Sequence, residues 1–104
     1  GGGWVMSDEA CPSEEQFLMN METGLKWLYE EFKVRRELDV KDPFGLSATT
    51  PSILAALGFE ALVINRVGTT VETELEKTQD LEFVWEGHPT GPDQNKYSLF
   101  THVL

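Results

Sequence analysis

The chain is poor in cysteine, and this scarcity limits how it can be held together. Cys11 is the single cysteine among 104 residues, so an internal disulfide and a metal site built from several thiolates are excluded. A chain of this length is expected to form one small domain around one hydrophobic core. A lone cysteine is typical of a cytosolic protein, and equally of a piece whose cysteine partner lies elsewhere in a longer chain.

Basic residues are also scarce, and long apolar runs are absent. The chain has 8 Lys and Arg against 18 Asp and Glu, which gives a net charge of −10. Such a surface repels nucleic acid phosphates and anionic membranes, so we expect no nucleic acid partner. No apolar run approaches the roughly 20 residues that cross a bilayer, so we expect no membrane segment. A neutral or cationic partner is favoured, although the acidic residues also suit a plain solvated surface.

The spacing of apolar residues predicts the helices. A helix over residues 13–33 begins at Ser13, which opens a capping box, and continues with an apolar stripe at helical spacing. Pro51 near the start and Gly58 just beyond the end are typical of a short second helix. A third, Glu-rich helix is predicted around residues 71–75.

Short apolar or alternating runs predict strands at residues 4–6, 38–41, 61–64, 81–85 and 97–103. The run 61–64 is continuously apolar, as expected of a strand buried on both faces. Strands that alternate with helices favour an α/β fold with a mainly parallel sheet. Right-handed connections would then place the carboxyl ends of the strands at one edge, where functional groups collect in such folds.

Polar side chains follow four of the predicted strands. A cleft at the sheet edge would be lined by carboxylates, an arginine and a histidine, from Ser7-Asp8-Glu9, Asp42, Asn65-Arg66, Glu86 and His88. Paired carboxyl groups are what the hydrolysis of a glycosidic bond requires. Loops at sheet edges are polar in any case, so this pattern indicates a cleft without establishing its chemistry.

Asp42 is the most constrained member of this set. It closes a predicted strand, and Pro43 and Gly45 after it make a stiff turn. A carboxylate held rigidly at a strand end suits a nucleophile or a metal ligand. Spacing alone favours a plainer interpretation, in which Asp42 accepts hydrogen bonds from its own turn.

Several blocks of sequence stand in order along nearly the whole chain. One is Asp42-Pro43-Phe44-Gly45, with Ser47, Thr49 and Pro51 after it, which resembles the nucleophile segment of glycoside hydrolase family 38 α-mannosidases. The other blocks are Gly2-Gly3-Trp4-Val5-Met6 with Asp8-Glu9-Ala10, Gly58-Phe59, the strand that ends in Arg66, Leu81-Glu82-Phe83-Val84-Trp85, and Leu99-Phe100-Thr101-His102.

The resemblance implies a partial (β/α) barrel-like catalytic α/β domain, of which residues 1–104 form an internal piece incomplete at both ends. It implies a retaining, zinc-dependent α-mannosidase that acts on mannose-containing glycans. Asp42 would be the nucleophile and one zinc ligand, and Phe44 and Arg66 would line the sugar site. The other zinc ligands and the acid/base carboxyl would lie outside this chain, so the isolated piece is expected to be inactive.

The resemblance also implies a place in the secretory pathway, in the Golgi or the lysosome, and a role in N-glycan processing. The chain departs from the family pattern at residues 35–41 and at Leu46, where the family usually has His. These departures motivate a second hypothesis, a non-catalytic α/β module that binds glycans or another protein. Open strand edges and bare apolar surface further predict that the isolated chain self-associates.

Overall fold

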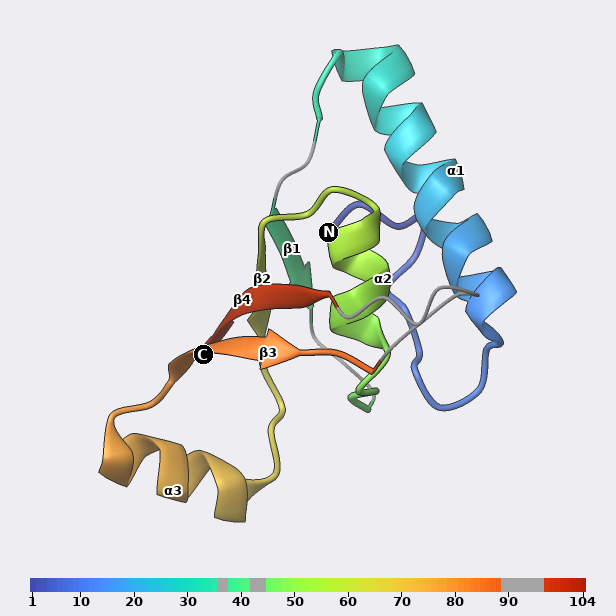
Figure 1. Ribbon diagram of the computed structural model, residues 1–104. Coiled ribbons are helices and arrows are strands. Elements are labelled where there is room, and N and C mark those ends of the chain that lie inside the picture. The colour runs from blue at the N-terminus through green and yellow to red at the C-terminus, as the bar shows by residue number, and fades with distance from the viewer. Residues whose placement is uncertain (36–37, 42–44, 89–96) are drawn as a thin grey trace.

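The computed structural model describes residues 1–35, 38–41, 45–88 and 97–104. Its elements are, in order, α1 (Glu14–Phe32), β1 (Leu38–Lys41), α2 (Thr50–Ala56), β2 (Ala61–Ile64), α3 (Thr69–Thr78), β3 (Glu82–Glu86) and β4 (Ser98–Val103). Figure 1 shows α1 and α3 at opposite ends of the molecule, with the sheet and α2 between them. The α/β class predicted from the sequence is confirmed.

The helix α1 begins where its capping box predicts. The Ser13 hydroxyl accepts a hydrogen bond from the Gln16 backbone N–H, and the Gln16 side chain accepts one from the Ser13 N–H. These two bonds satisfy backbone donors that a helix start leaves without partners. The helix ends at Lys33, whose backbone is left-handed, and it buries Phe17 and Met21 on one face.

The four strands form one mixed sheet in the order β1-β2-β4-β3. β2 pairs in parallel with β1 on one side and with β4 on the other, as predicted for these strands. β3 is antiparallel to β4, with Glu86 opposite Ser98, so the prediction of a shared carboxyl edge is wrong for β3. The reason is the short connection, because only residues 87–97 join β3 to β4, whereas a parallel pairing needs a crossover of about a dozen residues or more.

The core lies between α2 and one face of the sheet. Alternate residues of the two central strands point toward α2, and Leu62, Ile64, Leu99 and Val103 are each at most 2% exposed. They pack with Leu54 of α2, which is fully buried. Each of these side chains stabilises the fold by roughly 1.5–3 kcal/mol through its removal from water.

The opposite face of the sheet is only partly covered in the described part of the chain. Ala61 and Val63 of β2 are half-buried there, so within the described part of the chain β2 is fully buried on one face only. Val84 and Phe100, which lie directly opposite each other on β3 and β4, are 64% and 46% exposed. The helix α3 has no buried residue and so contributes little cover.

The strand predicted at residues 4–6 does not form. The Trp4 N–H donates to the Asn20 backbone carbonyl, and the Asn20 side chain both accepts from the Val5 N–H and donates to the Val5 carbonyl. The backbone groups of this apolar run therefore bond to α1 instead of to a neighbouring strand. Residues 4–6 form a loop laid along α1, with the three side chains exposed.

We expect Gly24→Ala to destabilise the fold by about 2–3 kcal/mol or more, because a Cβ atom at Gly24 of α1 would overlap the backbone of Gly2 and Gly3. A Cβ atom at Gly68 would meet nothing within 4 Å, so Gly68→Ala is the matched control and should change stability by less than about 1 kcal/mol. Denaturant titration followed by tryptophan fluorescence measures both. Equal losses in the two variants would contradict the close approach of residues 2–4 to α1.

Candidate functional site

The ends of β1 and β2 are where the sequence places its main candidates. The parallel register sets Lys41, the last residue of β1, beside Ile64, the last residue of β2. Asp42 follows Lys41 directly, but Asp42 and Phe44 lie outside the described residues, and their predicted roles stay predictions. Arg66 follows Ile64 by two residues and is described.

Arg66 is exposed and has a left-handed backbone, with φ 56°. The Asn65 side chain accepts a hydrogen bond from the Arg66 N–H at 2.7 Å, which supports this turn at the end of β2. For a residue with a side chain, the left-handed conformation costs roughly 1–2 kcal/mol, and such residues gather at functional sites. Lys33 and Gln79, which follow α1 and α3, share this conformation, so at Arg66 it marks a tight turn after β2, and the site role of Arg66 stays a prediction.

The turn that leads from the Asp42 segment into α2 is bound by Glu9. The Glu9 carboxylate accepts hydrogen bonds from the Ser47 N–H at 2.5 Å and from the Thr50 hydroxyl at 2.8 Å. Within the turn, the Thr50 N–H donates to the Ser47 carbonyl and the Thr49 N–H to the Ser47 hydroxyl. We name residues 45–50 the nucleophile-flanking turn, because they follow the block that resembles a nucleophile segment.

A second segment contacts the same turn from the end of β3. The His88 N–H donates to the Ala48 carbonyl at 2.9 Å, and the His88 carbonyl accepts from the Ser52 hydroxyl at 2.7 Å. Gly87 approaches so closely that a Cβ atom there would collide with the Ser52 side chain. His88 therefore acts here through its backbone.

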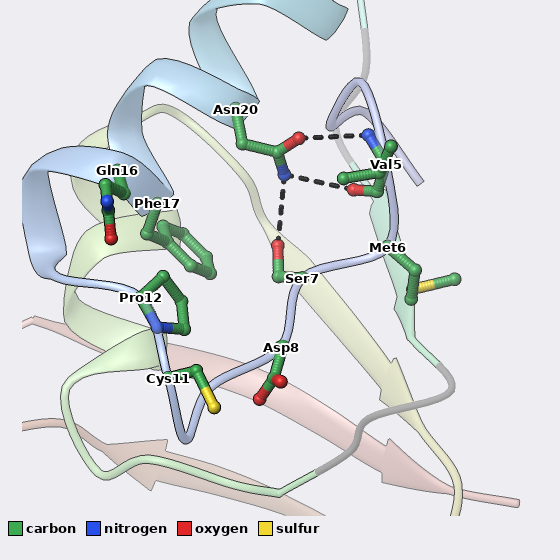
Figure 2. Close-up of a pocket in the computed structure, with 9 residues that line it drawn as sticks. All are labelled: Val5, Met6, Ser7, Asp8, Cys11, Pro12, Gln16, Phe17 and Asn20. Carbon is green, nitrogen blue, oxygen red and sulfur yellow. Dashed lines mark hydrogen bonds between the residues drawn. The ribbon is translucent and has the colours of Figure 1, made fainter.

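The segment that carries Glu9 is itself tied to α1. Figure 2 shows the Asn20 side chain bridging Val5 and Ser7, with the Ser7 hydroxyl accepting from Asn20 Nδ2 at 3.3 Å. The Ala10 N–H donates to the Asp8 carboxylate at 2.9 Å, which closes a local turn beside Glu9. A pocket of about 400 Å³ lies between this segment and the first turns of α1.

The predicted set of strand-end residues is thus only partly brought together. Glu9 and the backbone of His88 meet at the nucleophile-flanking turn, whereas Glu86 lies beside Ser98 at the start of β4. Because β4 is parallel to β2, that end of the sheet is opposite to Ile64 and Arg66. The expectation that Glu86 shares a cleft with Arg66 is wrong, and the antiparallel direction of β3 is the cause.

Three residues of this site escaped sequence reasoning: Asn20, Thr50 as a donor to Glu9, and Ser52. Asn20 occupies an ordinary polar position on a predicted helix, and no residue near Thr50 in the sequence indicates its bond to Glu9. The Asp8-Glu9-Ala10 block held the one usable clue, because it already belonged to the resemblance.

No group of three or more His, Cys, Asp and Glu side chains gathers closely enough to hold a metal ion, within residues 1–35, 38–41, 45–88 and 97–104. Zinc in proteins ordinarily takes at least three protein ligands. The described residues therefore do not fit a zinc ion by themselves. Across the same described ranges, no helix has the length and apolar character that would let it span a membrane.

Comparison with known proteins shows the class of this chain. Residues 1–104 match the N-terminal domain of glycosyl hydrolases family 38. An epididymis-specific α-mannosidase of Sus scrofa is 38% identical over 99% of this chain, and α-mannosidase F of Dictyostelium discoideum is 36% identical over 99%. α-Mannosidase 2 of Drosophila melanogaster is 36% identical, also over 99%.

The match and these relatives define the class as a glycosyl hydrolase domain. The chain belongs to glycosyl hydrolase family 38, as the resemblance of its sequence blocks predicted. It covers 10% of the first two relatives and 9% of the third, so it spans about a tenth of their length.

We expect Arg66→Gly to be more stable than Arg66→Ala by about 1 kcal/mol, because both variants lose the guanidinium but only glycine adopts a positive φ without a Cβ clash. Val67, whose φ is not positive, is the matched control: there the Ala variant should be at least as stable as the Gly variant. Denaturant titration of the four variants checks both orders. An Ala variant as stable as the Gly variant at position 66 would contradict the left-handed backbone.

Proposed function

We propose that this chain is part of the catalytic domain of a retaining α-mannosidase that hydrolyses α-mannosidic bonds in glycans. The observation that carries the proposal is the parallel register of β1 and β2. Asp42 and Arg66 follow the two strand ends that this register sets side by side. Membership of family 38, and relatives named as α-mannosidases, support the substrate class.

In the proposed mechanism the Asp42 carboxylate attacks the anomeric carbon of a mannosyl residue. The bond to the leaving oxygen breaks as a second carboxyl group, supplied from beyond this chain, gives that oxygen a proton. The covalent ester between mannose and Asp42 is then cleaved by water, which the second carboxylate deprotonates. Two inversions at one carbon give net retention of configuration.

Phe44 and Arg66 are assigned supporting roles in the proposed site. The Phe44 ring would pack on the apolar face of the sugar. The Arg66 guanidinium would favour the ionised form of the Asp42 carboxylate by opposite charge, which keeps the nucleophile ready to attack.

The proposal includes a zinc ion in the complete enzyme, with Asp42 as one ligand. Zinc in such a site would act as a Lewis acid and as a template for sugar hydroxyls. The described residues do not form a ligand set, so the mechanism above uses only side chains and water. We further propose that the complete enzyme acts on N-glycans in the Golgi or the lysosome.

Asp42→Ala in the full-length enzyme that carries this chain is expected to lower kcat by about 10⁴-fold or more, because it removes the attacking group. Asp80→Ala, at an exposed carboxylate between α3 and β3, is the control and should leave kcat unchanged. A fluorinated mannosyl donor should label the peptide that contains Asp42. A label on another residue contradicts the assignment, and a full-length protein with neither turnover nor label favours the non-catalytic module.

The isolated 104-residue chain is expected to self-associate and to show no mannosidase activity. Val84 and Phe100 form an exposed apolar pair on the open face of the sheet, and attraction at contact range is little affected by charges screened beyond about 8 Å. Sedimentation should show a mass that rises with concentration and falls in the double variant Val84→Thr, Phe100→Thr. A compact monomer at every concentration would contradict the association, and hydrolysis of an aryl α-mannoside would contradict the inactivity.

A further inference from the structure

The chain is held on both sides of residues 42–44, on one side by strand pairing and on the other by hydrogen bonds to a side chain. On the amino-terminal side, Lys41 is held in the parallel ladder beside Ile64. On the carboxyl-terminal side, the nucleophile-flanking turn is held by the Glu9 carboxylate through Ser47 and Thr50. The first anchor belongs to the sheet, whereas the second combines the backbone of His88 with one carboxylate from a distant part of the sequence.

At the start of α2 the N-cap residue, Thr49, makes no side-chain capping bond, and the Thr50 N–H donates to the Ser47 carbonyl. Glu9 places a carboxylate at this end and binds the Thr50 hydroxyl, which is only 3% exposed. Hydrogen bonds to an ionised acceptor are roughly twice as strong as neutral ones. The carboxylate also complements the positive end of the helix.

Glu9 is well placed to hold the turn because its own segment is secured. Asn20 binds Val5 and Ser7 from α1, and Ser7 is 8% exposed. On the other side of the turn, the backbone of His88 binds Ala48. The turn is thus held between the segment bound to α1 and the end of β3. The contact on the α1 side is made by the Glu9 carboxylate.

We propose that Glu9 is a positioning residue for Asp42, acting through Ser47 and Thr50. This inference rests on the proposed function, because it assigns Glu9 to the same reaction. Glu9 does not touch the sugar in this scheme. It holds the nucleophile-flanking turn, which follows residues 42–44 in the sequence, and loss of this hold would misplace the attacking group in the proposed reaction. Misplacement of a reacting group by about 1 Å lowers rate by roughly 10²-fold.

The test uses the full-length enzyme and an aryl α-mannoside. Glu9→Ala should lower kcat by about 10- to 100-fold with KM changed less than about twofold, since binding groups stay in place while the nucleophile shifts. Glu9→Gln keeps an acceptor oxygen and should recover part of that loss. Glu14→Ala is the matched control, because Glu14 lines the same small cleft as Glu9, Ser47 and Thr50 and is exposed. Its kcat should be unchanged.

Thr50→Val removes the donor hydroxyl while it keeps the shape of the side chain. Its effect on kcat should be largely absent in the Glu9→Ala background, because the two groups act as one unit. If Glu9→Ala fails to fold, Thr50→Val alone still decides: an unchanged kcat overturns the proposal. A higher KM with an unchanged kcat in Glu9→Ala also overturns the proposal. Equal losses of kcat in Glu9→Ala and Glu14→Ala overturn it as well. Asp42→Ala, run beside them, separates the two claims, since an active Asp42→Ala enzyme removes the proposed function itself.

Discussion

β2 exchanges backbone hydrogen bonds along both of its edges, with β1 on one side and β4 on the other, and both neighbours run parallel to it. This central position fixes most of what surrounds it. Leu62 and Ile64 are set on the face that α2 covers, and the last residue of β1 is brought beside the last residue of β2. A shift of β2 by one residue would turn its buried side chains to the open face. The core and the candidate site therefore depend on the same register.

Local signals in the sequence sufficed for most of the elements. The α1 helix and its Ser13 cap, the short α2 helix and four of the five strands were all predicted, because each is defined by periodicity or by a cap within a few residues. The apolar run at residues 4–6 was wrongly predicted to be a strand. Its backbone is bound by Asn20, sixteen residues after Trp4, and the apolar side chains give no indication of that contact. The antiparallel direction of β3 was not predicted either, because alternation of apolar and polar residues does not distinguish a parallel from an antiparallel strand.

The candidate site shows a sharper limit. Residues at strand ends were selected because parallel strands gather their carboxyl ends, and this holds for the neighbours β1 and β2 but not for Glu86. The bonds from Glu9 to Ser47 and Thr50 join positions about forty residues apart, and no local pattern encodes such a pair. Family resemblance identified the block that contains Glu9, while only the fold shows what the carboxylate holds.

The antiparallel return of β3 has a consequence for the order in which the sheet assembles. β3 and β4 are neighbours in the sequence as well as in the sheet, whereas β2 meets β4 only when α3 and β3 have been looped out between them. Loop closure becomes entropically more costly as the loop lengthens, and non-local pairings therefore form late. During folding, the β3–β4 pair is expected to form first. Its inner face stays uncovered until β2 pairs with β4. Paired residues of β1 and β2 lie 23 apart in the sequence (38 and 61) and those of β2 and β4 lie 39 apart (61 and 100), so the β2–β4 pairing at the centre of the sheet is the last to close.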